Sequence, residues 1–427
     1  MLKKLNLGKE EKITFKIHFV YSIIEGIIAG VLALNEFVLI KSLKGTDYQI
    51  GILFQLSVIV LIISIVFNEL LKNFKNKKKL LRIIGIITRM PLVLLIFFPK
   101  DMAILANSST YQIFFLAVFL IYFLANPFIF PTINLFLKNS YQHSNFGKLY
   151  SWSTTANKVV MLVATLLFGI LLDYDNYAYV YVYPSLAVLG IISIFLLSRI
   201  KFKSNEDVIK KQSIKYSIID SGKNMLRIIK TNKPYRDFEI GFMLYGFAWM
   251  TTVAVITIFF DKVLHLNYSS VAFYKNSYNI IAIFLLPVFG KLIGKIDPRK
   301  FAIYTFLFLL LHLFFLALTQ FFSFNFEFLG IKVYYSLIVA YISYGLFAAT
   351  MALLWFIGSA YFCKDKEAAH YQSIHLTLTG VRGLFAPLLG VLFYKLIGFT
   401  GAFLIGILFL AIAMFIMYLS MKRDKIK

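Results

Sequence analysis

The sequence predicts an all-α membrane protein with twelve transmembrane helices in two pseudo-symmetric bundles of six. Three observations support this prediction: many long apolar segments, a one-sided distribution of positive charge, and a parallel repeat of about half the chain. The chain is 60% hydrophobic and only 15% charged, whereas soluble domains are about 25% charged. This composition excludes an ordinary soluble domain.

The apolar segments are long enough to be membrane spans, each of which needs about 20 residues. Backbone groups facing lipid must be satisfied internally, so a span is a helix or part of a closed barrel. Barrel strands alternate in polarity over about ten residues, whereas these segments are continuously apolar. The twelve predicted helices lie near 17–40, 48–71, 80–98, 112–137, 150–172, 177–198, 238–260, 269–293, 301–323, 332–358, 371–394 and 399–421.

Positive charge is concentrated on one predicted side of the membrane. Of the 44 Lys and Arg residues, 34 lie in the two tails and the alternate loops on the same side, and 6 lie in the opposite loops. This is the positive-inside pattern, and it places both termini in the cytoplasm. The net charge of +24 is therefore explained by topology and by attraction to anionic lipid, and nucleic acid is not an expected partner.

The two halves of the chain repeat each other at an offset of about 221 residues. Lys41 and Lys262 each end a long apolar segment, and Tyr150 in the first half corresponds to Tyr371 in the second. Parallel repeats are typical of two-lobed transporters with a binding site between the lobes. We therefore divide the chain into an N-terminal bundle (1–198), a cytoplasmic basic linker (199–236) and a C-terminal bundle (237–427).

The linker contains an amphipathic segment at 214–229, which fits either a helix on the inner membrane surface or a solvated linker.

No segment outside the predicted membrane spans is large enough for an enzymatic domain, so we expect no enzyme activity. The chain has a single cysteine, Cys363, which excludes an internal disulfide and a thiol-based metal cluster. No cofactor or metal is expected.

The twelve helices, the duplication and the long basic central loop together resemble the major facilitator superfamily. A sharper resemblance lies in the turn after the eighth predicted helix, where the family has Gly, three residues, Asp, a basic residue, any residue, Gly, any residue and two basic residues. Gly294 stands in place of the Asp and Asp297 in place of the second Gly. The matching residues are Gly290, Lys295, Arg299 and Lys300.

The resemblance implies that this turn helps to close the cytoplasmic side, with Asp297 or Glu69 as the substitute acidic residue. It also implies a monomeric protein that alternates between two states. The subfamily is not identified by any motif. The first-half turn, 68–78, keeps only the terminal basic pair of the pattern.

Charged side chains within the predicted spans are candidate site residues, because a charge at mid-bilayer costs roughly 2.5–3.5 kcal/mol. Lys158 and Arg382 lie on equivalent helices of the two halves. They are predicted to bind an anionic group of a substrate, for which Arg provides bidentate contact and Lys a point charge. Lys275 is a third candidate. The alternative is that each is a structural ion pair, for example between Lys158 and Glu25.

Glu25 is the predicted proton-coupling residue, because a buried carboxylate can change its proton affinity when a cavity opens and closes. The alternative role for Glu25 is helix packing. Glu36 is a second coupling candidate, or a residue of the outer interface. Arg89 is expected to hold neighbouring helices together. Asp237 and Glu239, at the start of the seventh helix, are expected at the interface.

Uncharged residues complete the predicted substrate site. The resemblance places the fourth, seventh and tenth helices along a central cavity, where aromatic and amide side chains can contact a solute. Aromatic residues are 18% of the chain, so packing is the alternative role for each of them. The candidates are Asn126, Tyr245, Trp249 and Tyr344.

The predicted function is secondary active transport of a small organic solute, with an anionic one favoured, by alternating access coupled to protons. The alternatives are a multidrug or lipid-like exporter, and a non-transporting receptor or scaffold with the same fold. The expected location is the bacterial cytoplasmic (inner) membrane. The expected partners are a small-molecule substrate, protons and membrane lipids.

Overall fold

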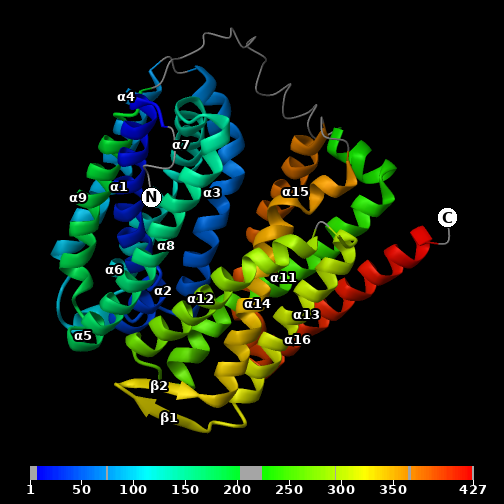
Figure 1. Cartoon of the computed structure of the whole chain (residues 1–427). Helices are drawn as coiled ribbons and strands as arrows, with labels where there is room; N and C mark the ends of the chain where they lie inside the picture. Colours follow the sequence, from blue (N-terminus) through cyan, green and yellow to red (C-terminus); the bar gives the residue numbers. More distant parts are fainter. Residues whose placement is uncertain (1–6, 74–75, 202–223, 294, 364–366, 426–427) are drawn as a thin grey trace. The chain divides into compact units, whose positions relative to one another are not determined.

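The computed structural model describes residues 7–73, 76–201, 224–293, 295–363 and 367–425, and almost all of them are helical (Figure 1). Residue contacts divide the chain into two compact units. Unit 1 comprises Met1–Gln49 and Val60–Lys211, and unit 2 comprises Ile50–Ile59 and Gln212–Lys427. Each unit is described by itself below.

The first half of the chain begins with helix α1 and ends with α9; two of its predicted spans contain a change of helix type, and a third is broken between two α-helices. Its elements are α1 (Lys9–Leu32), α2 (Asn35–Phe37), the π-helix η2 (Val38–Ser42), α3 (Asp47–Asn73), α4 (Lys77–Arg89), the 3-10 helix η3 (Met90–Phe97), α5 (Met102–Asn107), α6 (Thr110–Phe123), α7 (Asn126–Ser140), α8 (His143–Tyr174) and α9 (Tyr179–Leu197).

The second half contains the one β-hairpin of the described chain, and its last two predicted spans form one long helical run. Its elements are α11 (Lys233–Lys262), α12 (Tyr268–Ile293), α13 (Pro298–Thr319), β1 (Asn325–Phe328), β2 (Ile331–Tyr334), α14 (Tyr335–Ile357), the 3-10 helix η4 (Ser359–Phe362), α15 (Ala368–Gly383) and α16 (Ala386–Lys425). Residues 224–231 are also helical, and the rest of the predicted surface helix lies outside the described residues.

The twelve-helix fold is confirmed. Among the described residues, ten helical runs are long and apolar enough to cross a membrane. One of them, Tyr371–Asp424, is 54 residues long and is interrupted at Gly398, where a φ of 74° leaves the helical region; it accounts for the last two spans. The 27-residue helix α3 accounts for the remaining one.

Proline explains several of the breaks within spans. Pro127 follows the break between α6 and α7, and Pro387 follows the break between α15 and α16. Proline has no N–H to donate and disfavours helical geometry in the residue before it. Pro91 likewise lies at the start of η3, where the α-helix tightens to a 3-10 helix.

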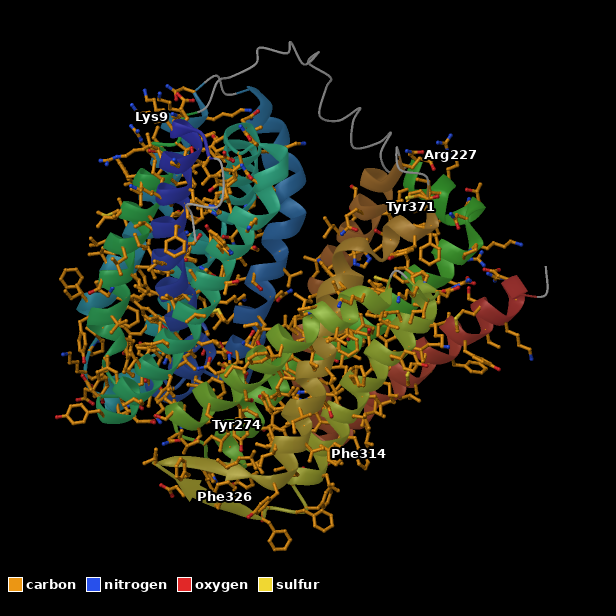
Figure 2. The ribbon with its side chains drawn as sticks, viewed as in Figure 1. Lys9, Arg227, Tyr274, Phe314, Phe326 and Tyr371 are labelled. Atoms are coloured by element: carbon orange, nitrogen blue, oxygen red, sulfur yellow. The ribbon has the colours of Figure 1, made fainter. Side chains whose placement is uncertain are left out.

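The loop predicted at 324–331 is an antiparallel hairpin, with Phe326 opposite Val333. Its turn is formed by Leu329 and Gly330, which both have positive φ. Strand β2 is anchored to α12, because the Tyr334 N–H donates to the Tyr274 hydroxyl oxygen at 2.8 Å (Figure 2). The hairpin is therefore fixed to unit 2 by hydrogen bonds.

Close helix contact in unit 1 depends on glycine. Helix α1 packs along α8, where Gly26 and Gly30 face the backbone of Asn157 and Met161. A Cβ at Gly30 would lie 2.5 Å from the Met161 carbonyl oxygen. The close approach also allows the Thr165 hydroxyl to donate to the Gly30 carbonyl at 3.0 Å. Small residues at helix interfaces give membrane helices this close packing.

We expect Gly30→Val to lower the stability of the purified protein by about 1–3 kcal/mol, because the added side chain must displace α8. Thermal unfolding in detergent measures the loss. Gly290→Ala is the matched control, since nothing lies within 4 Å of a Cβ there. An unfolding temperature for Gly30→Val equal to that of the wild type would contradict this account of the α1–α8 contact.

Candidate functional site

Two buried polar side chains, Glu239 and His375, join α11 to α15 in unit 2. Glu239 and His375 are only 3% and 2% exposed, and the His375 Nδ1 lies 3.0 and 3.1 Å from the two carboxylate oxygens of Glu239. The His375 ring also contacts Phe242 and Trp355, with centroids 4.8 and 4.7 Å apart. The pair is therefore enclosed by aromatic rings.

Arg382 lies on the same helix as His375, about two turns further along, and is 1% exposed. Its Nη1 donates to the Phe242 carbonyl of α11, and its guanidinium carbon lies 5.5 Å from the centre of the Tyr245 ring. Arg382 also interacts electrostatically with Glu239. A side chain at Gly246 would overlap the guanidinium, so the glycine makes room for the buried cation.

Glu239, His375 and Arg382 therefore form one charged group, which we call the unit 2 cluster. Two of its buried nitrogens, the His375 Nε2 and the Arg382 Nε, have no hydrogen-bond partner. Tyr235 is a further titratable neighbour, and it donates through its hydroxyl to the Tyr371 carbonyl at 2.8 Å. Figure 2 labels Tyr371 at the start of α15.

Three of the predicted aromatic candidates adjoin one another in unit 2. The Trp249 Nε1 donates to the Tyr344 hydroxyl at 3.2 Å, which links α11 to α14. Tyr245 stacks on Phe306 of α13 with centroids 5.1 Å apart, and Tyr344 contacts the His312 ring at 4.5 Å. These residues form an aromatic layer next to the unit 2 cluster, because Tyr245 contacts both.

A second charged group lies in unit 1, where Glu25 and Arg89 interact electrostatically. The Ser193 hydroxyl of α9 donates to the Glu25 carboxylate at 2.5 Å. Arg89 is 2% exposed; its Nη1 donates to the Tyr122 carbonyl at 3.3 Å, and its guanidinium carbon lies 3.8 Å from the Tyr122 ring centre. This unit 1 cluster joins α1, α4, α6 and α9, and the Arg89 Nε in it has no partner.

The other predicted site residues lie apart from these clusters. Lys158 is half-buried on α8, with its Nζ 4.0 Å from the Met161 sulfur. Lys275 on α12 and Asn126 at the start of α7 are half-buried as well. Glu36 is 6% exposed in α2. The carboxylate of Glu25 thus has Ser193 and Arg89 as neighbours, which is a different pairing from the Lys158 bridge weighed from the sequence.

The basic turn between α12 and α13 is built around Arg299. Asp297 caps α13 by accepting from the Arg299 N–H at 2.7 Å and pairs with the Arg299 Nη2 at 2.8 Å. The Arg299 Nη1 pairs with Asp424 of α16 at 2.5 Å, and Arg423 pairs with Asp237 of α11 at 2.8 Å. These ion pairs tie together the ends of three helices, while Lys295, Lys300 and Gly290 are exposed.

The charge on Asp297 is stabilised in the folded protein. Burial raises the pKa of the Asp297 carboxyl, but the hydrogen bonds that it accepts from the side chain and backbone of Arg299 lower the pKa by more. The net result is a pKa below the ordinary value. The acidic residue of this turn is thus used to fix the end of α13.

The sequence profile of the Major Facilitator Superfamily matches residues 15–356. The chain belongs to the Major Facilitator Superfamily. Solved structures agree: a mutant of the nucleoside transporter NupG is 13% identical with a TM-score of 0.69, covering 96% of this chain and 100% of its own. No curated protein sequence matches the chain.

Other solved structures with this fold carry different solutes. A mutant of the peptide transporter POT is 13% identical with a TM-score of 0.71, covering 96% of this chain and 94% of its own. A D-xylose–proton symporter is 14% identical with a TM-score of 0.63, covering 96% of both chains. At such low identity these likenesses show the fold alone. As a Major Facilitator protein, the chain is a membrane transporter and not an enzyme.

The unit 2 cluster was only partly visible in the sequence of this Major Facilitator protein. Glu239 and Asp237 were expected at the membrane interface, but they are 3% and 9% exposed. The sequence did hold one signal for the α15 side of the cluster: His375 and Arg382 are seven residues apart, which places both on one face of a helix. In the part of the chain that the structure describes, no group of His, Cys, Asp and Glu suits a metal ion.

We expect Asp297→Asn to lower the free energy of unfolding at pH 7 by less than about 1 kcal/mol, since the carboxyl is partly exposed. Asn keeps the helix cap but loses the charge. The folded-state pKa is lowered, so the contribution of the charge is complete above the unfolded value of about 3.9 and is lost as the pH falls through the folded value.

The measurement is the difference in unfolding temperature between wild type and Asp297→Asn as a function of pH. The difference should be constant near neutral pH and shrink only in acid. Lys300→Gln, an exposed neighbour, is the control and should show no such difference. A difference that grows as the pH falls would contradict the assignment.

Proposed function

We propose that this transporter is a secondary active carrier of a small organic solute that uses alternating access and is driven by protons. An anionic solute is favoured. The proposal places the protein in the bacterial cytoplasmic membrane with both termini inside. The single observation that carries it is the buried unit 2 cluster, where a carboxylate, an imidazole and a guanidinium lie together away from water.

The charge of the cluster explains the coupling. The cluster holds one carboxyl group, one guanidinium and one imidazole, so its charges balance when the carboxyl is ionised and the imidazole carries no extra proton. A proton on His375 or Glu239 gives it a net charge of +1, which is costly in a low-dielectric interior. An anionic group of the solute offsets that charge. Proton and anion therefore favour each other's binding, and this reciprocity is what a symporter requires.

Two nitrogen atoms are available to such an anion. The Arg382 Nε is a permanent donor, and the His375 Nε2 becomes a donor when the ring is protonated. Both are buried without a partner. Lys158 remains the candidate cation of unit 1 and Lys275 a further one, and both assignments stay predictions from the sequence.

Proton coupling has a precedent among structures of similar fold, since one of them is a D-xylose–proton symporter. The nucleoside and peptide transporters show how widely the solutes of this fold vary. We favour the unit 2 cluster over Glu25 as the coupling group. Glu25 accepts a hydrogen bond from Ser193 and faces Arg89, which fits a role in holding helices together.

The orientation is tested by thiol labelling in a Cys363→Ser background. We expect a membrane-impermeant maleimide to label Gly330→Cys, at the tip of the hairpin, in intact cells. Lys295→Cys, in the basic turn, should be labelled only after the cells are permeabilised. Labelling of Lys295→Cys in intact cells would reverse the proposed topology.

Coupling is tested in liposomes with nucleosides, peptides, sugars, organic anions and dyes, with and without an inward proton gradient. We expect Glu239→Gln and His375→Gln to lose gradient-driven accumulation, which for one coupled proton and a gradient of one pH unit is about tenfold. Exchange of solute at equal concentrations should continue, because it requires no net proton movement. Arg382→Gln should lower the apparent affinity for an anionic solute.

His18→Gln is the matched control, because His18 is also a buried histidine, 4% exposed, whose Nδ1 lies 3.1 Å from the Tyr141 hydroxyl in unit 1. This control should keep its coupling. Accumulation that survives in Glu239→Gln but is lost in Glu25→Gln would move the coupling site to unit 1. Transport of dyes alone would favour the exporter alternative, and no flux of any compound would favour a receptor or scaffold.

A further inference from the structure

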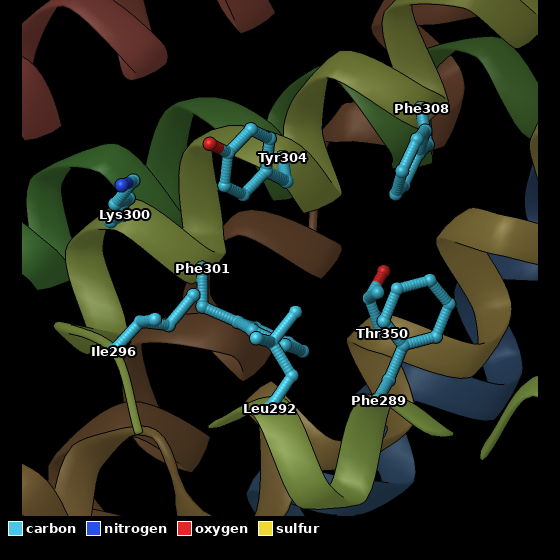
Figure 3. A pocket seen from close by; sticks show the side chains of 8 residues that line it. All are labelled: Phe289, Leu292, Ile296, Lys300, Phe301, Tyr304, Phe308 and Thr350. Atoms are coloured by element: carbon cyan, nitrogen blue, oxygen red, sulfur yellow. The ribbon is translucent and has the colours of Figure 1, made fainter. Parts of the chain in front are cut away.

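A groove with apolar walls runs along unit 2 between α12 and α13 (Figure 3). Its cavity volume is about 380 Å³. Phe289 of α12 faces Phe301 and Phe308 of α13, with ring centroids 6.4 Å apart in both cases. Helix α14 packs against both helices, and its buried Thr350 closes the inner side of the groove.

One end of the groove is cationic. Lys300 lines the cavity beside Ile296, at the end opposite Phe308 and Thr350 (Figure 3). A neighbouring cavity of about 410 Å³ shares Leu292 with the first and is lined by Lys291 and Lys295. The three lysines are exposed, and none of them forms an ion pair with any residue that the structure describes.

The groove therefore has the polarity of an amphiphile. The wall from Lys300 to Phe308 rises about 12 Å along the helix at 1.5 Å per residue, and three aromatic rings, those of Phe301, Tyr304 and Phe308, line it. Its cationic end lies at the turn between the two spans Tyr268–Ile293 and Pro298–Thr319, and we expect the end of a span to lie at the level of the lipid headgroups.

We propose that this groove binds one anionic phospholipid of the inner leaflet. The acyl chain lies against Phe289, Phe301 and Phe308, and the phosphate lies among Lys291, Lys295 and Lys300. The proposal rests on the cytoplasmic orientation of the turn, because the inner leaflet carries the anionic lipids. It does not depend on the solute or on proton coupling.

Charge selects an anionic lipid over a zwitterionic one. Phosphatidylcholine has no net charge, because its positive headgroup nitrogen offsets its phosphate, so three unpaired lysines attract it weakly. Phosphatidylglycerol has a net negative charge, which the lysines attract. Free phosphate satisfies the lysines but leaves the apolar wall unused. The lysines are therefore expected to determine which headgroup binds, and the apolar wall to determine whether an acyl chain binds.

The test is native mass spectrometry of the full chain in detergent with phosphatidylglycerol or phosphatidylcholine of equal chain length. We expect phosphatidylglycerol to be retained about tenfold or more over phosphatidylcholine. The triple variant Lys291→Gln, Lys295→Gln, Lys300→Gln should lose this preference. Replacement of the same three lysines by Arg should keep it, which excludes misfolding as the cause of the loss.

Two further variants test the acyl-chain contact and the location of the positive charge. Leu292→Trp, which narrows the junction of the two cavities, should reduce retention of the intact lipid. The triple variant Lys9→Gln, Lys12→Gln, Lys16→Gln removes equal charge from exposed positions on α1 and should bind phosphatidylglycerol like the wild type. Circular dichroism confirms that every variant is folded.

The proposal is overturned if both lipids are retained equally, or if the α1 triple variant loses the preference as the groove variant does. It is also overturned if glycerol phosphate or inorganic phosphate displaces the lipid as well as phosphatidylglycerol does, since the site would then bind a free anion. Because retention is measured without transport, its failure is distinguishable from a failure of the proposed function.

Discussion

The structure depends on one constraint: a polar group inside the bilayer must find its partner within the protein, because the hydrocarbon offers none. Helices meet this constraint for the backbone. For the buried charges, each unit meets it by grouping ions of opposite sign. Arg89 faces Glu25 in unit 1, and Arg382 faces Glu239 in unit 2, so that each of these two buried guanidinium groups has a carboxylate nearby.

Small residues make these groupings possible. Gly246 leaves the space that the Arg382 guanidinium occupies, and Gly26 and Gly30 let α1 approach α8 closely. A close helix contact brings the side chains on either side of it within hydrogen-bonding range, as Asn157 shows by donating to the Ser22 carbonyl at 2.9 Å. Packing and electrostatics are therefore linked, since a bulkier residue at these glycines would separate the partners of the buried polar groups.

The sequence predicted the spans well because span length follows directly from bilayer thickness. It also predicted that Arg89 would hold helices together. It missed the pairing of Glu239 with His375, because both lie near the ends of apolar segments, where a charged residue normally reaches water. Burial there depends on which neighbouring helix covers the position, and Trp355 of α14 and Phe242 supply that cover. Such tertiary contacts leave no periodic signal in one sequence.

The two halves of the repeat share equivalent helix contacts but differ in their buried polar side chains. Tyr150 contacts His18 of α1, and the equivalent Tyr371 contacts Tyr235 of α11, so each tyrosine packs on the first long helix of its half. The unit 1 cluster, however, holds a carboxylate and a guanidinium, whereas the unit 2 cluster adds an imidazole. Imidazole is the side chain whose charge ordinarily changes near neutral pH. The duplicated backbone can therefore hold a different set of buried polar side chains in each half, because the repeat constrains helix packing and leaves the residues inside each bundle free to differ.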